Sequence, residues 1–134
     1  MQHPPPAPSR RLLPLVIASA VVLLGACVSP IERPADCDAP AVVRDATLTS
    51  AHQLEPETIT VCRDQAVTLA VDIQTDGVLH LHGYDDQASA LEVTAGTPIT
   101  LAFDAVHPGQ FVIELHTSDG PAGLGVGILT VDEP

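Results

Sequence analysis

Three histidines and one glutamate recur in a pattern that could hold a metal ion. His80 and His82 flank one leucine, and Glu114 and His116 flank another. On a β-strand, residues two apart share a face and lie about 7 Å apart. Imidazole and carboxylate groups are suitable ligands for Cu(II) and Zn(II). We therefore expect these four residues to bind copper or zinc without redox chemistry if the two segments are neighbours. The alternative is that they are solvated side chains on an exposed sheet face.

The cysteines point to export rather than to catalysis. Cys37 and Cys62 are 25 positions apart, whereas redox or metal-binding pairs are closely spaced. In a compartment that permits oxidation, such an even pair predicts a disulfide. Closing a loop of this length stabilises the fold by about 3 kcal/mol, because it restricts the unfolded chain.

The first 26 residues predict a signal peptide. Arg10 and Arg11 precede an apolar run from Leu12 to Ala26, which is too short to span a bilayer as a mature helix. Since Ser9-Arg10-Arg11 also resembles a twin-arginine motif, both the general and the twin-arginine export routes remain open.

The end of this segment, Leu24-Gly25-Ala26-Cys27, resembles the bacterial lipobox. That resemblance implies cleavage before Cys27 and lipid attachment to its sulfur. We therefore expect an exported protein, anchored through Cys27 to the cell membrane or the outer membrane. Residues 27–40, rich in proline and aspartate, would form a short tether, and residues 41–134 the folded domain.

Charge and composition exclude several classes of function. After Cys27 the chain has seventeen acidic residues and three arginines, a net charge of −14, and no lysine occurs anywhere. Such a surface repels phosphate backbones, and three aromatic residues offer few stacking platforms, which excludes nucleic acid as a partner. A cationic protein partner fits this charge, and docking such a partner without any metal is the alternative function. No Gly-x-Ser-x-Gly motif is present, and we expect no enzymatic activity.

Period-two alternation of apolar residues predicts an all-β fold, a Greek-key β-sandwich. The predicted strands are Val43–Leu48, Ile59–Cys62, Val67–Val71, Leu79–His82, Leu91–Val93, Ile99–Phe103, Phe111–Leu115 and Ile128–Val131. Short helical turns are expected near residues 52–56 and 86–90. Tyr84 and Asp85 are expected to form a turn on the sheet edge, and Gly123, Gly125 and Gly127 to give a flexible loop before the last strand.

An internal repeat links the two histidine-bearing segments. A shift of 32 residues superposes Val67–Asp72 on Ile99–Asp104, and two further positions align Val78–His82 with Val112–His116. Each unit would be a hairpin followed by a strand. Alternation then points Leu79, Leu81, Ile113 and Leu115 inward, with the histidines and Glu114 on the other face. His82 and His116 occupy corresponding positions and are expected to be adjacent.

From Pro56 to Val131 the chain resembles cupredoxin-like domains of exported bacterial proteins. The resemblance is carried by Pro56-x-x-Ile59-x-Val61, by His-x-His-Gly-Tyr-Asp from His80 to Asp85, by Pro108-Gly109-x-Phe111, and by the final strand Ile128–Val131. Copper-binding members take Cys, His and Met ligands from the loop before the last strand. Here the Cys position falls on Leu115, the Met position on Leu124, and Ser118 stands where the His would be. The resemblance therefore implies the fold without a type 1 copper centre.

Overall fold

The computed structural model describes Met1 and residues 33–120 and 122–133. The expected signal peptide, Cys27 and the first part of the tether lie outside the described residues. The chain divides into two units, Met1–Pro30 and Ile31–Pro134, and every strand among the described residues belongs to the second. Among the described residues, no helix is long and apolar enough to cross a membrane.

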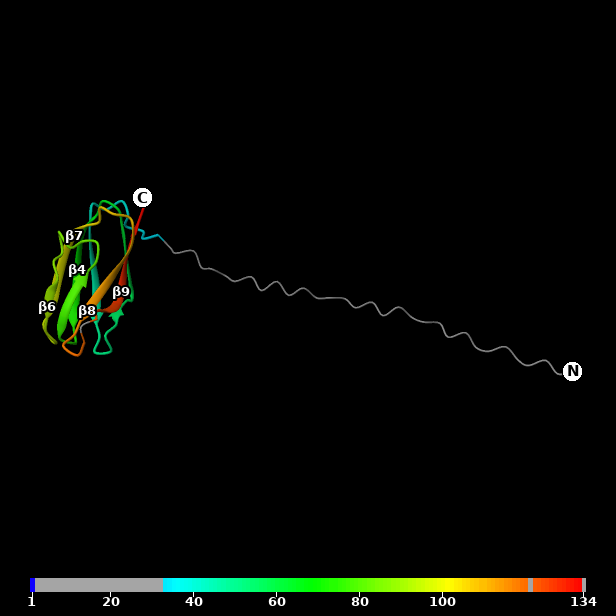
Figure 1. The fold of residues 1–134 in the computed structure, drawn as a ribbon. Coiled ribbons are helices and arrows are strands. Elements are labelled where there is room, and N and C mark those ends of the chain that lie inside the picture. The colour runs from blue at the N-terminus through cyan, green and yellow to red at the C-terminus, as the bar shows by residue number, and fades with distance from the viewer. Residues whose placement is uncertain (2–32, 121, 134) are drawn as a thin grey trace. The chain divides into compact units, whose positions relative to one another are not determined.

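The domain is a sandwich of two sheets, whose layers are visible in Figure 1. The four-stranded sheet has the order β2-β1-β4-β7 and the five-stranded sheet the order β3-β9-β8-β5-β6. The strands are β1 (Ala41–Leu48), β2 (Leu54–Glu55), β3 (Thr58–Cys62), β4 (Ala66–Ile73), β5 (Gly77–Leu81), β6 (Leu91–Val93), β7 (Ile99–Asp104), β8 (Gly109–His116) and β9 (Leu124–Asp132). The prediction of an all-β sandwich is confirmed.

All eight predicted strands are present, and the helical turn expected at residues 52–56 is the main local error. Residues 52–56 contain the short strand β2 instead, because Leu54 is buried and its backbone pairs with Leu48 of β1. The turn expected at residues 86–90 forms two positions earlier: the Ala88 amide donates to the Tyr84 carbonyl at 2.7 Å and closes a single turn. Neither segment is a helix.

The core lies between the two sheets and uses the apolar face that alternation predicts. Leu79 and Leu81 of β5 and Ile113 and Leu115 of β8 are all buried. Tyr84 is buried as well, so its predicted place on the sheet edge is wrong. Its ring packs against Phe103 and Phe111, and its hydroxyl donates to the His107 carbonyl at 3.1 Å. Burial raises the pKa of the Tyr84 hydroxyl above its usual value.

The repeat units are not hairpins, contrary to expectation. Strands β3, β4 and β5 correspond to β6, β7 and β8, and the middle strand of each unit lies in the opposite sheet from its neighbours. This crossing lets consecutive strands pack their apolar faces against each other across the core. The corresponding strands pair instead: β4 with β7 and β5 with β8, both antiparallel.

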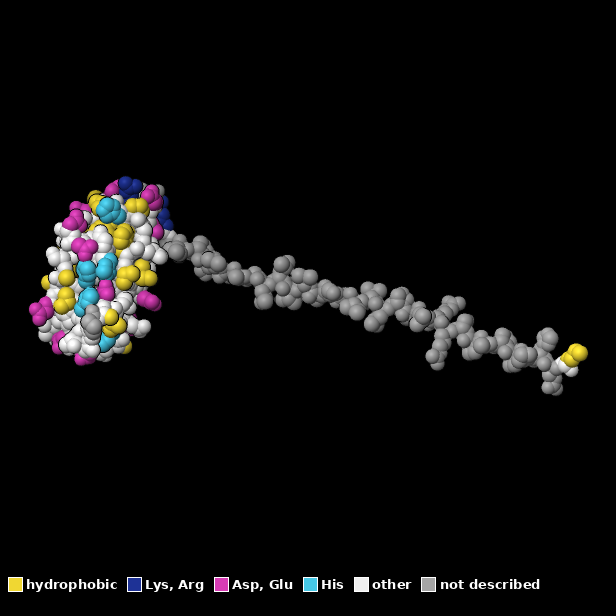
Figure 2. All heavy atoms as spheres, in the orientation of Figure 1, with side chains coloured by type: hydrophobic (Ala, Val, Ile, Leu, Met, Phe, Trp, Pro, Cys, Tyr) yellow, Lys and Arg dark blue, Asp and Glu magenta, His cyan; other side chains and the backbone are white. Residues whose placement is uncertain are grey.

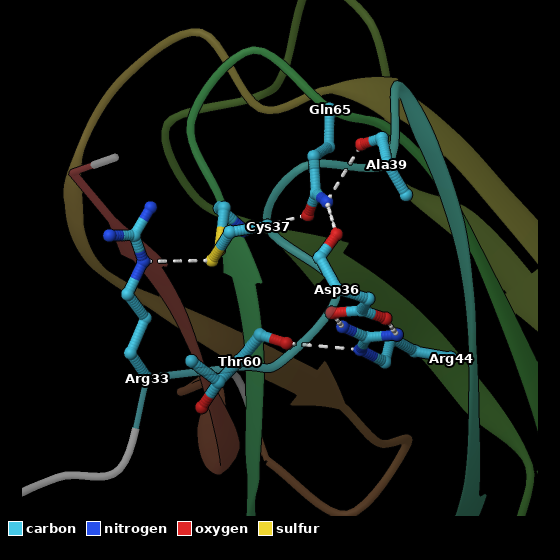
Figure 3. The surroundings of a disulfide bond; sticks show 8 residues. Arg33, Asp36, Cys37, Ala39, Arg44, Thr60 and Gln65 are labelled. Atoms are coloured by element: carbon cyan, nitrogen blue, oxygen red, sulfur yellow. Dashed lines mark hydrogen bonds and ion pairs between the residues drawn. A yellow bond between two sulfur atoms is a disulfide. The ribbon is translucent and has the colours of Figure 1, made fainter.

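A disulfide and a polar network fix residues 36–39 to the sandwich (Figure 3). Cys37 is bridged to Cys62 at the end of β3, with Cα atoms 5.3 Å apart. The buried Gln65 accepts from the Cys62 amide at 2.8 Å and donates to the carbonyls of Asp36 and Ala39. Because both the oxygen and the nitrogen of the Gln65 side-chain amide form hydrogen bonds, its burial leaves no polar atom without a partner and avoids the desolvation penalty of such an atom.

An ion pair completes this network. Both terminal nitrogens of Arg44 lie 2.9 Å from the Asp36 carboxylate, and Arg44 Nε donates to the Thr60 carbonyl at 3.0 Å. This contact with Arg44 holds the pKa of Asp36 below its usual value. The segment that enters the domain is therefore held by covalent, polar and ionic contacts together.

Removing the disulfide should destabilise the domain substantially. In Cys37→Ala/Cys62→Ala the unfolded chain regains the freedom of a 25-residue loop, so the free energy of unfolding should fall by about 3 kcal/mol. Urea unfolding of both proteins in the same detergent measures this. A midpoint equal to that of the parent chain, with the same dependence on denaturant, would contradict a stabilising role.

Candidate metal centre

The predicted metal ligands meet on the outer face of the five-stranded sheet. In the antiparallel pairing of β5 with β8, His80 is the direct partner of Glu114, and Val78 is the partner of His116. His82 follows the end of β5, and its amide donates to the Val112 carbonyl at 3.1 Å. Because the leucines between these residues point into the core, the histidines and Glu114 point outward. Figure 2 shows histidine and acidic side chains gathered on this face.

Three of the four residues converge closely enough to share one ion. One ligand atom each from His80, Glu114 and His116 lies within 4.8 Å of the other two. His116 Nε2 lies 3.8 Å from Glu114 Oε1. All three side chains are partly buried, which limits their freedom before any ion arrives.

His82 lies beside this group but is not part of it. Its Nε2 contacts the other carboxylate oxygen of Glu114, Oε2, and its ring centroid lies 4.4 Å from that of His80. The expected adjacency of His82 and His116 is wrong. Because β5 and β8 run antiparallel, equivalent positions of the repeat lie on opposite sides of the His80–Glu114 pair.

Asp85 joins the cluster, although we expected it only to form part of a turn. Its Oδ1 contacts His80 Nε2. The hydrogen bond from His80 holds the pKa of the Asp85 carboxyl below its usual value. The signal that could have found it is Gly83: its φ of 80° reverses the chain directly after His82 and returns Asp85 to the outer face.

The Glu114 carboxylate is held as an anion. The hydrogen bond from His82 lowers its pKa most, and the nearby histidines add to that effect. The two carboxylate oxygens of Glu114 face different histidines: Oε2 contacts His82, and Oε1 faces His116.

The glycines near the last strand are not a flexible loop, which corrects the sequence prediction. Gly125 and Gly127 lie within β9, and Gly123 immediately precedes it. A β-carbon at Gly123 would overlap the Glu114 carboxylate, and one at Gly127 would lie 2.9 Å from the Leu54 Cβ. Gly123 therefore leaves the space that the Glu114 carboxylate occupies.

The donor set fits a divalent ion of the copper or zinc type. Metal–ligand bonds of about 2.0–2.2 Å place ligand atoms roughly 3–4 Å apart, and the 3.8 Å between His116 Nε2 and Glu114 Oε1 falls in that range. Two nitrogens and one oxygen leave at least one coordination position, which water would fill on this partly exposed face.

Comparison with known proteins identifies the fold. No protein-family model matches the chain, and no curated protein matches it. Among solved structures, the blue copper oxidase from Nitrosomonas europaea aligns with a TM-score of 0.55 at 18% identity, covering 69% of this chain and 39% of that one. A copper-binding protein solved in its apo form gives 0.53 at 11%, covering 69% and 89%. The blue copper protein auracyanin A from Chloroflexus aurantiacus gives 0.51 at 13%, covering 69% and 99%.

These likenesses show that the domain has a cupredoxin-like fold, as the sequence resemblance implied. The chain spans between 30% and 42% of the length of the multicopper oxidases that it matches. Leu115, which takes the position of the ligand cysteine in that resemblance, is buried in the core, and Leu124 is exposed at the start of β9. The Leu115 side chain therefore lies on the opposite face of β8 from its neighbours Glu114 and His116.

Substituting Gly123→Ala should disturb Glu114 without unfolding the domain. The added β-carbon displaces the carboxylate from His82, so the pKa of Glu114 should rise towards its usual value. Carboxyl carbon chemical shifts, followed by NMR against pH, measure this.

The matched control is Gly120→Ala, since a β-carbon there meets no atom within 4 Å. Its Glu114 titration should coincide with that of the parent chain. Equal Glu114 pKa values in both variants would mean that Gly123 has no part in placing the carboxylate.

Proposed function

We propose that this chain is an exported lipoprotein whose cupredoxin-like domain binds Cu(II) or Zn(II) without redox chemistry. The observation that carries the proposal is the convergence of His80, Glu114 and His116 within 4.8 Å on one sheet face. Strands bring these residues together from segments more than thirty positions apart, and the ligand types match the preferences of both ions.

Glu114 is the central ligand in this proposal. Its Oε1, which faces His116, is the oxygen that would bind the ion, and its Oε2 stays with His82. His82 then orients the carboxylate instead of binding the metal itself. Such outer hydrogen bonds fix the geometry of a ligand and tune its basicity.

The cysteine chemistry supports a role without electron transfer. Both cysteines of the described domain, Cys37 and Cys62, are bridged to each other. A type 1 copper centre requires a thiolate ligand, and the disulfide leaves none among the described residues. Copper bound by two imidazoles and a carboxylate would lack the intense thiolate absorption of blue copper.

The lipobox at Leu24–Cys27 supports attachment of the domain to a bacterial membrane through Cys27. Two or three acyl chains would hold the protein there despite its acidity, at about 0.8 kcal/mol per buried CH₂. The short tether would keep the histidine cluster near that membrane, on the periplasmic or extracellular face.

Titration with Zn(II) and Cu(II) tests the metal site directly. The titration uses the full chain in detergent micelles, with His3→Ala wherever residues 1–26 are retained, since His3 is the one histidine outside the domain. Calorimetry should give a Kd below about 10 μM, roughly −7 kcal/mol. His116→Ala and Glu114→Gln should weaken binding at least 100-fold, and His82→Ala about 10-fold.

The control is His107→Ala, since this exposed histidine contributes its backbone to the contact with Tyr84 and no atom to the metal group. It should bind both ions as the parent does. Affinity weaker than 10 μM, or affinity unchanged by His116→Ala and Glu114→Gln, would refute the metal site and leave a metal-free interaction domain.

Mass spectrometry of the protein extracted from bacterial membranes tests the anchor. We expect a mature N-terminus at Cys27 carrying the mass of its acyl chains. A mature N-terminus at any other residue would contradict lipidation, and the Cys27→Ala variant provides the unmodified reference.

A further inference from the structure

We infer that Asp85 is a positioning residue that fixes the tautomer of His80, keeping the ring proton on Nε2 and leaving Nδ1 to bind the metal. The metal part of this inference rests on the proposed function. The tautomer itself is a property of the metal-free chain, and it can be measured separately.

The contact between the two residues is specific. Asp85 Oδ1 contacts Nε2 of His80, and the His80 side chain is 21% exposed. A neutral imidazole donates from one nitrogen and accepts at the other. Because the Asp85 carboxylate can only accept, Nε2 must carry the proton, and Nδ1 keeps the free lone pair.

The fold holds Asp85 in place on both sides. Before it, Gly83 takes a φ of 80°, and a β-carbon there would lie 2.5 Å from the Phe111 ring. Tyr84 is fully buried against Phe103 and Phe111. After it, the Gln87 and Ala88 amides donate to the Tyr84 carbonyl at 3.0 and 2.7 Å. The carboxylate is thus presented by a turn whose central residue is anchored in the core.

Asp85 differs from Glu114 in its surroundings. Glu114 has a second oxygen directed at His116 and belongs to the group of converging ligands. Asp85 does not belong to that group, and among the described residues its histidine contact is with His80 alone. Asp85 therefore acts on the ion through His80, in the manner of the outer carboxylates that orient metal-bound histidines.

The adjacent residue Asp86 provides a matched control. It is exposed, carries the same charge in the same turn, and makes no ion pair with a histidine within residues 33–120 and 122–133. Asp86→Ala removes one negative charge near the cluster without removing the contact to His80. Any difference between Asp85→Ala and Asp86→Ala therefore reports the contact and not the charge.

The first experiment uses the metal-free full chain in detergent. Two-dimensional ¹⁵N–¹H NMR of the histidine rings, at a pH where His80 is neutral, should show the Nε2–H tautomer in the parent and in Asp86→Ala. In Asp85→Ala, His80 should show a changed tautomer population. A proton on Nδ1 in the parent, or identical spectra for His80 in all three proteins, would overturn the inference.

The second experiment measures Zn(II) affinity by calorimetry in the same proteins. Asp85→Ala should weaken binding about 10- to 100-fold, Asp86→Ala should leave it unchanged, and Asp85→Glu should restore part of the loss. If the parent binds Zn(II) and Asp85→Ala binds it equally well, Asp85 has no positioning role. If the parent binds no Zn(II), the proposed function fails, and the tautomer measurement still decides whether Asp85 fixes His80.

Discussion

The antiparallel register of β5 with β8 is the constraint on which the candidate site depends. Leu79 faces Leu115 and Leu81 faces Ile113, and all four side chains are buried in the core. A slip of one residue would move this apolar set to the outer face, so the core specifies the register strongly. The same pairing sets His80 opposite Glu114. The hydrophobic core therefore aligns the polar cluster, which lies on the opposite face of the same two strands.

The residues around the ligands come from less regular parts of the chain. Asp85 is supplied by the turn after β5, and the space for the Glu114 carboxylate by Gly123 before β9. The strands provide ligands at fixed spacing, and the turns provide the groups that orient them. This division follows from geometry, since alternation along a strand puts every second residue on one face, and a turn can bring a further side chain back over that face.

The sequence predicted the strands and their buried faces because period-two alternation records burial directly. It also predicted that His80, His116 and Glu114 would share a face. Alternation contains no information on strand direction, so the expected contact of His82 with His116 was wrong. The repeat shows that His82 and His116 occupy equivalent positions in their strands. Because β5 and β8 pair antiparallel, equivalent positions lie apart. Asp85 and Gly123 were missed because their roles depend on φ angles and on contacts across the sheet. Tyr84 was misplaced since its burial depends on the aromatic rings of β7 and β8.

The bridge between Cys37 and Cys62 also determines how the domain bears load. Tension applied to the chain ahead of Cys37 crosses the disulfide to Cys62, at the end of β3 that pairs with Asp132 near the C-terminus. Strands β1 and β2 lie inside the closed covalent loop, so the covalent path of that tension bypasses them. In the oxidised protein, pulling therefore cannot peel β1 from β4. In the reduced protein β1 becomes the first strand to be loaded, so the oxidation state of one bond decides which strand of the sandwich yields first.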